Sequence, residues 1–206
     1  MHTRIKICGL TRSEDVEVVA DAGADAVGFV FYPPSPRYVT PARAAELARS
    51  LPPFVSVVGL FVNADADTVR QALASAPIHL LQFHGDEDDA YCRQFGRPFI
   101  KAARVRPGLD LLQYAAAFPS AQALLLDAFV DGYGGGGAVF DWSLVPAALS
   151  RTLVLSGGLD VDNVGEAIRR LQPAAVDVSS GVEAAKGIKD AAKVRAFVAA
   201  ARAADL

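Results

Sequence analysis

The run Arg4-Ile5-Lys6-Ile7-Cys8-Gly9-Leu10 is the first of eight short apolar runs that alternate with Ala-rich, helix-like segments along this 206-residue chain. It is typical of a strand that ends at a cysteine, with a glycine next to let the chain turn. The runs are mostly apolar throughout, as expected of parallel strands covered on both faces. The predicted strands are residues 3–8, 26–31, 55–61, 78–83, 99–103, 123–127, 153–156 and 175–179.

Helix start signals precede the segments between these strands. They are Ser13-Glu14-Asp15, Thr40-Pro41, Asp65, Asp86, Asp162 and Asp190. Residues 108–118 are also helical by pattern, and a sixth helix is expected to start near Asp141-Trp142. Eight strand–helix units in a chain of this length predict a closed (β/α)₈ TIM barrel, as one domain over residues 1–206. A doubly wound open sheet is the alternative.

Composition narrows the functional classes. Hydrophobic residues make up 52% of the chain, which argues against disorder, and no apolar stretch approaches the roughly 18 residues of a membrane span. A net charge of −3 argues against a general nucleic-acid binder. Cys8 and Cys92 lack CxxC or histidine-spaced partners, which predicts reduced thiols in a cytoplasmic protein and no metal site.

The connections after the second and sixth strands are longer than the others. Their extra residues are 32–38, which include three prolines, and 130–137, which end in four glycines. Because both insertions follow strands, both are expected at the C-terminal ends of the strands. TIM barrel enzymes keep their chemistry on that face.

Two residues at strand ends suit acid–base chemistry. Cys8 is a base or a nucleophile if it lies in an active site, and otherwise a small buried hydrophobe. Asp127 ends the apolar run 124–126, where partial burial favours the protonated form and makes proton donation possible near neutral pH. A helix cap or a salt-bridge partner is the other interpretation of Asp127. Lys6 is near Cys8 in sequence, but we expect strand alternation to point it away from the thiol.

Small residues follow the seventh and eighth strands. Gly157-Gly158 and Ser179-Ser180-Gly181 allow backbone N–H groups to approach an anion, and a short helix near Val182 would add its positive end. These loops are the usual phosphate site of TIM barrels. They predict a small-molecule phosphorylated ligand, with two ordinary turns as the alternative.

Three further polar residues are candidates for substrate binding. Arg37 lies in a proline-stiffened loop and suits recognition of a carboxylate, although a solvated surface arginine is the alternative. Gln82 suits hydrogen bonding on the floor of a pocket. His84, beside Gly85, is a candidate base or a structural residue.

Eight motifs span nearly the whole chain. They are KICGL (6–10), DAVGFVFYPPSPRYV (25–39), VGLFVN (58–63), LQFHG (81–85), LLLDAF (124–129), GGGGAVFDW (134–142), LSGGL (155–159) and DVSSGVE (177–183). In order and spacing they resemble the phosphoribosylanthranilate isomerase family of tryptophan biosynthesis. The resemblance implies an Amadori rearrangement of N-(5-phosphoribosyl)anthranilate to 1-(2-carboxyphenylamino)-1-deoxyribulose 5-phosphate, without a cofactor.

The resemblance also implies a role for each site residue. Asp127 is the general acid, which protonates the furanose ring oxygen, and Cys8 is the general base, which removes the C2 proton. Arg37 holds the anthranilate carboxylate, and Asp177 contacts the amine or hydroxyls of the substrate. The phosphate is implied to bind to the backbone of Gly158, Ser180 and Gly181.

One motif departs from the family pattern, and two other functions stay open. The family commonly has GGTGK after the sixth strand, whereas this chain has Gly136 and Ala138 at the threonine and lysine positions. We interpret this as a change in loop order. The alternatives are another sugar-phosphate barrel, such as the histidine-pathway aminoaldose isomerase or indole-glycerol-phosphate synthase, and a silent barrel that only binds a phosphorylated ligand or a protein. The sequence is compatible with a monomer or a homodimer.

Overall fold

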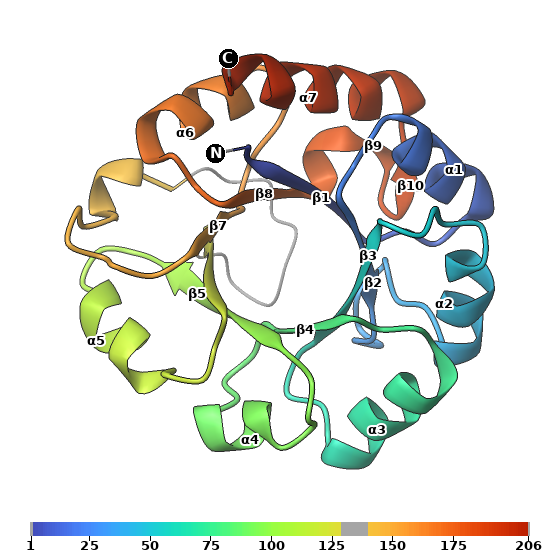
Figure 1. Cartoon of the computed structure of the whole chain (residues 1–206), viewed down its shortest axis with the longest axis horizontal. Coiled ribbons are helices and arrows are strands. Elements are labelled where there is room, and N and C mark those ends of the chain that lie inside the picture. Colours follow the sequence, from blue (N-terminus) through green and yellow to red (C-terminus); the bar gives the residue numbers. More distant parts are fainter. Residues whose placement is uncertain (1, 129–139, 206) are drawn as a thin grey trace.

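Eight parallel strands close into one barrel in the computed structural model, which describes residues 2–128 and 140–205 (Figure 1). The strands follow one another round the ring in sequence order, and β8 pairs with β1. They are β1 (Arg4–Cys8), β2 (Ala26–Val30), β3 (Ser56–Phe61), β4 (Leu80–Phe83), β5 (Phe99–Val105), β6 (Ala123–Ala128), β7 (Leu153–Leu155) and β8 (Ala175–Val178). The predicted (β/α)₈ barrel is confirmed, and the open sheet is excluded.

Helices form an outer ring around the strands (Figure 1). They are α1 (Ser13–Asp21), α2 (Pro41–Ala48), α3 (Ala66–Ser75), α4 (Asp89–Arg93), α5 (Leu111–Ala117), α6 (Val164–Leu171) and α7 (Ala191–Ala204). The predicted caps Thr40, Asp65 and Asp190 are confirmed, because each side chain accepts a backbone N–H of the first turn. Among the described residues, no helix is long and apolar enough to cross a membrane.

Two of the predicted helix starts are wrong. Asp88, rather than Asp86, caps α4, and its carboxylate accepts the N–H of Tyr91 at 2.7 Å. The N-cap of α6 is Asn163 rather than Asp162. In both cases several aspartates or asparagines stand near the helix start, so sequence preference alone does not choose between them.

The helix predicted after β6 is a single 3₁₀ turn, η1 (Trp142–Leu144). Its start signal is correct, because the Asp141 carboxylate accepts the N–H of Ser143 at 2.9 Å. The turn ends at Val145, which is extended. Pro146 follows directly, and a proline disfavours helical geometry at the residue before it. The proline therefore limits this segment to one turn.

A short antiparallel hairpin after β8 was not predicted from the sequence. A 3₁₀ turn, η2 (Ser180–Val182), leads into β9 (Glu183–Ala185), which pairs with β10 (Ile188–Lys189). Gly187 makes the turn with a φ of +78°, a conformation that favours glycine. The hairpin brings Glu183 and Lys189 back toward β1.

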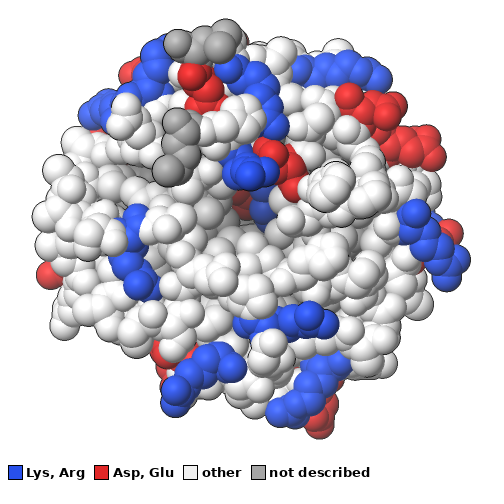
Figure 2. Space-filling view, viewed as in Figure 1, with Lys and Arg blue, Asp and Glu red and all other residues white. Residues whose placement is uncertain are grey.

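The barrel interior changes from apolar to polar along the strands. A small apolar cluster lies inside the barrel below the polar strand ends, on β5, β6 and β7. Its buried members are Ile100, Ala102, Ala123, Leu125 and Val154. Because alternate residues of a strand share a face, Asp127 follows Leu125 into the interior at the C-terminal end of β6. Most charged side chains on the face seen in Figure 2 lie around the perimeter, over the helices.

Candidate active site

Cys8 lies at the end of β1 and is 5% exposed. A Cβ built on Gly28 of β2 would lie 2.6 Å from Sγ of Cys8 and 3.1 Å from Nζ of Lys6. The thiol and the ammonium therefore approach each other in space that a glycine leaves open. The prediction that Lys6 points away from Cys8 is wrong, because residues two positions apart on a strand share a face.

A buried ion pair stands beside this thiol. The Lys6 Nζ lies 2.9 Å from both carboxylate oxygens of Asp177 on β8, and both side chains are 5% exposed. Burial opposes the charge of Lys6, but Asp177 and the thiol together raise the pKa of Lys6 above its ordinary value. Burial raises the pKa of the Cys8 thiol, and the Lys6 ammonium opposes that shift. Lys6 is thus a charged group that favours the thiolate.

Asp127 enters the same end of the barrel from β6, with its side chain 14% exposed. Its Oδ1 accepts the N–H of Ala128 at 2.9 Å, and its Oδ2 lies 2.9 Å from Nε2 of His84. A Cβ on Gly157 would lie 2.9 Å from Oδ1, so the loop after β7 packs directly against the carboxyl. β7 and β8 separate β6 from β1 in the ring, so Asp127 and Cys8 reach the barrel interior from different sides.

Gln82 and His84 come from the end of β4. His84 contacts the Asp127 carboxyl, and Gln82 contacts His84. Nε2 of Gln82 lies 3.1 Å from Nδ1 of His84. Both ring nitrogens of His84 therefore have a protein partner, Gln82 on one side and Asp127 on the other. The substrate-binding roles predicted for the two residues must accommodate these contacts.

The loops after β7 and β8 pack backbone against backbone. Gly157 and Gly158 have φ values of +79° and +65°, and a Cβ on Gly181 would overlap the carbonyl oxygen of Leu159. Within the described parts of the chain, the backbone N–H groups of Gly158, Ser180 and Gly181 have no hydrogen-bond acceptor. Unpaired N–H groups gathered by glycines can bind an anion.

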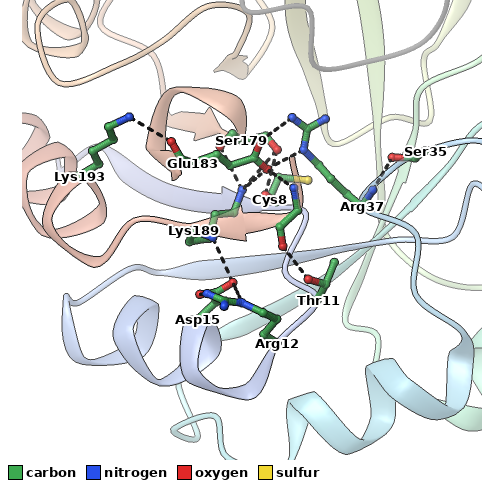
Figure 3. A network of polar contacts seen from close by, with 11 residues as sticks. Cys8, Thr11, Arg12, Asp15, Ser35, Arg37, Ser179, Glu183, Lys189 and Lys193 are labelled. Carbon is green, nitrogen blue, oxygen red and sulfur yellow. Dashed lines mark hydrogen bonds and ion pairs between the residues drawn. The ribbon is translucent and has the colours of Figure 1, made fainter. Parts of the chain in front are cut away.

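Arg37, in the loop after β2, is buried rather than solvated as the alternative interpretation expected. Its Nε and Nη2 donate to the two carboxylate oxygens of Glu183 at 2.7 and 2.8 Å. Lys189 Nζ lies 3.1 Å from the same carboxylate. Figure 3 shows Arg37 reaching from its loop toward Cys8 and Glu183. Hydrogen bonding to Glu183 raises the pKa of Arg37, and burial opposes the rise.

The same network fixes the end of β1 to the loop after β8 (Figure 3). Ser179 Oγ donates to the carbonyl oxygen of Cys8 at 3.1 Å, and Lys189 Nζ donates to the carbonyl oxygen of Ser179 at 3.0 Å. No role was predicted from the sequence for Glu183 or Lys189. Their only signal is a pair of opposite charges on either side of the turn at Gly187.

The contacts described above do not bear on two other predictions, the looser glycine-rich loop and the lack of a metal site. Gly136 and Ala138, the departures in the glycine-rich motif, lie outside the described residues. Over residues 2–128 and 140–205, no three histidine, cysteine, aspartate or glutamate side chains are placed to hold a metal ion.

A sequence model of the N-(5'-phosphoribosyl)anthranilate isomerase family matches residues 5–200. The chain belongs to the phosphoribosylanthranilate isomerase family. It is 68% identical over 205 residues to the N-(5'-phosphoribosyl)anthranilate isomerase of Dechloromonas aromatica, covering 100% of this chain and 99% of that one. The resemblance seen in the motifs is thereby confirmed.

Solved phosphoribosylanthranilate isomerases share the barrel. The Thermotoga maritima enzyme is 41% identical, with a TM-score of 0.90 over 98% of this chain and 99% of that one. A second crystal structure is 40% identical, with a TM-score of 0.87 over 98% and 99% of the two chains. That protein is in complex with reduced 1-(o-carboxyphenylamino)-1-deoxyribulose 5-phosphate.

Proposed function

We propose that Cys8 and Asp127 catalyse the Amadori rearrangement of N-(5-phosphoribosyl)anthranilate to 1-(2-carboxyphenylamino)-1-deoxyribulose 5-phosphate in this chain. One observation carries the proposal. A thiol and a carboxyl enter the same end of the barrel from β1 and β6, beside a group of unpaired backbone N–H groups. Family membership supports the reaction, and the geometry supports the division of roles.

Asp127 acts first, as the general acid. Its carboxyl gives a proton to the furanose ring oxygen, the bond from C1 to that oxygen breaks, and an iminium forms between C1 and the anthranilate nitrogen. The low exposure of Asp127 and its contact with the loop after β7 hold the donor in one orientation.

Cys8 acts second, as the general base. Its thiolate takes the proton from C2, and the electron pair moves into the iminium to give an enolamine, which tautomerises to the ketone. Burial raises the pKa of Cys8, so the base needs a nearby cation, and Lys6 supplies it. Lys6 therefore acts through the thiol as a positioning residue.

The substrate is anchored at its two charged ends. The N–H groups of Gly158, Ser180 and Gly181 bind the phosphate, while Gly157 and Ser179 shape the two loops. Arg37 binds the anthranilate carboxylate. Because Glu183 occupies its Nε and Nη2 edge, the Nη1 group is the donor left for the substrate. Asp177, proposed to reach the substrate's amine or hydroxyls, also holds Lys6.

The reaction is tested with freshly made phosphoribosylanthranilate in a coupled assay of the purified protein. We expect turnover of this substrate and none of the histidine-pathway aminoaldose. Turnover of the second substrate alone would assign the chain to a different isomerase reaction. Binding of a phosphorylated ligand without turnover of either would leave only a binding protein.

Lys6→Met is expected to shift the acidic limb of the kcat/KM profile to higher pH by roughly 1–3 units, because the thiolate loses its neighbouring cation. Catalysis by a base requires the thiolate, so the rate rises with pH through the pKa of Cys8. The substitution also leaves Asp177 buried and unpaired, which is expected to cost about 3–5 kcal/mol of stability. The pH–rate profile and thermal unfolding measure the two effects.

The double variant Lys6→Met/Asp177→Asn separates them. It removes both charges, so stability should recover while the acidic limb stays shifted. An acidic limb at its wild-type position in both variants would exclude Lys6 as the group that favours the thiolate.

Arg37→Ala is expected to raise KM roughly 10- to 100-fold with a smaller change in kcat, because a charge-assisted contact to the substrate carboxylate is lost in ground and transition states alike. Arg195→Ala is the matched control, since the exposed side chain of Arg195 donates to the carbonyl oxygen of Ala191 within its own helix, α7. Steady-state kinetics of the two variants provide the comparison. Equal KM values would rule out the carboxylate contact.

A further inference from the structure

Gln82, His84 and Asp127 form an unbranched chain of contacts inside the barrel. The Gln82 Nε2 lies 3.1 Å from Nδ1 of His84, whose Nε2 lies 2.9 Å from Oδ2 of Asp127. Gln82 is 0% exposed and His84 is 6% exposed. The other carboxyl oxygen of Asp127 accepts the N–H of Ala128 at 2.9 Å. The imidazole is therefore fixed between an amide and a carboxyl, and its proton positions are set by these two neighbours.

One side-chain polar atom of Gln82, His84 and Asp127 lacks a hydrogen-bond partner within the described residues. Oε1 of Gln82 is buried and accepts no hydrogen bond within the described residues. A buried polar atom without a partner is costly and rare, so it calls for a physical reason. His84 is the one hydrogen-bond partner of the Gln82 amide among those residues, so a half-turn of the amide would exchange its oxygen and nitrogen without breaking any other hydrogen bond.

The protonation state of the His84–Asp127 pair decides which way the Gln82 amide must face. When Asp127 is a carboxylate and His84 is neutral, Nε2 carries the hydrogen, Nδ1 is bare, and Gln82 must present its NH₂ group, as in the structure. With one more proton, the pair takes one of two forms. Either a protonated Asp127 faces a bare Nε2 of neutral His84, or an Asp127 carboxylate faces the Nε2–H of an imidazolium. In both of these forms Nδ1 carries a hydrogen, and Gln82 must present Oε1.

We propose that Gln82 is a positioning residue whose amide turns to match the tautomer of His84, so that the His84–Asp127 pair stores the proton used for ring opening. The proposal rests on the role of Asp127 as the general acid. It gives the unpaired Oε1 a function, since that oxygen is the acceptor for the loaded form. It also replaces direct substrate contact by Gln82 and His84 with action through Asp127.

The charged groups around this pair come from several strands and from the loop after β4. Arg104 of β5 lies opposite Asp127 in the strand register, and the Lys6–Asp177 pair lies with Cys8 on β1 and β8. Lys101 and Glu87 form a buried ion pair, and Glu87 accepts the N–H of Gly85 next to His84. Gln82→Met leaves all of these charges in place and adds none, so a shift in its pH dependence reports on the amide.

Nitrogen-15 NMR of the wild-type imidazoles tests the proposal without any substitution. The chain has three histidines, and His84→Gln assigns the signal of His84 by its loss. Because the acid must carry its proton, kcat/KM is expected to fall at alkaline pH as the His84–Asp127 pair loses that proton. We expect Nδ1 of His84 to be without a hydrogen at pH values above this alkaline fall and to carry one below it. A bare Nδ1 on both sides of that fall would overturn the proposal. This signal does not depend on turnover, so it is separate from a failure of the isomerase assignment, which the activity assay detects.

Two variants give the kinetic counterpart. Gln82→Glu offers only acceptors and is expected to move the alkaline fall of kcat/KM to higher pH by about 1 unit or more. Gln82→Met offers neither donor nor acceptor and is expected to move the fall to lower pH and to reduce kcat roughly tenfold. Gln113→Met, on the exposed face of α5, is the control for the same change in side chain. An unchanged position of the fall in both Gln82 variants would reduce Gln82 to a packing role.

Discussion

Cys8→Ala is expected to lower kcat by roughly 10²–10⁴ with little change in KM, because the variant keeps the phosphate and carboxylate contacts but has no base for the C2 proton. The substitution removes a small side chain, so the barrel should still close. The rise of kcat/KM with pH that reflects ionisation of the thiol should also disappear. Steady-state kinetics across pH measure both effects.

Cys92→Ala is the matched control for loss of a buried thiol. Cys92 lies on α4, and burial raises the pKa of its thiol to about 12, so it has no role as a base near neutral pH. The control should lose some stability but keep the wild-type kcat. A Cys8→Ala variant that turns over at the wild-type rate would remove the thiol from the mechanism.

Asp127→Asn is expected to lower kcat by a similar factor, roughly 10²–10⁴, because an amide of the same shape has no proton to release to the ring oxygen. The side chain can still contact His84 and the N–H of Ala128, so folding and substrate binding should be little affected. Kinetics and ligand binding of the variant measure the split between catalysis and binding.

Asp110→Asn is the control for this exchange of acid for amide. Asp110 caps α5, and asparagine is nearly as good a cap as aspartate, so both rate and stability should stay close to those of the wild type. If Asp127→Asn behaved like Asp110→Asn, ring opening would need another acid.

The fold was predictable because parallel strands buried on both faces leave a strong pattern. Eight apolar runs with helical segments between them account for the closed ring. The short helix after β6 was overestimated because the prediction used the start signal at Asp141 and gave too little weight to Pro146. The hairpin β9–β10 was missed because its strands are only three and two residues long, too short for a period to be recognised.

The candidate site was predictable as residue types at strand ends, but its partnerships were not. Lys6 was placed on the wrong face by an error of parity, since alternation puts residues 6 and 8 together. Arg37 and Glu183 are 146 positions apart in sequence, and His84 and Asp127 are 43 positions apart. Nothing local marks such contacts, because only closure of the barrel brings these strand ends together.

The central claim is that Asp127 protonates the ring oxygen and Cys8 removes the C2 proton of one sugar held at the barrel mouth. A crystal structure of this protein with reduced 1-(o-carboxyphenylamino)-1-deoxyribulose 5-phosphate measures it most directly. The account predicts Sγ of Cys8 beside C2 and a carboxyl oxygen of Asp127 within about 2.6–3.2 Å of the oxygen that closed the furanose ring. A ligand bound with its phosphate on the Gly158–Gly181 loops but with C2 away from Cys8, or with that oxygen out of reach of Asp127, would contradict it.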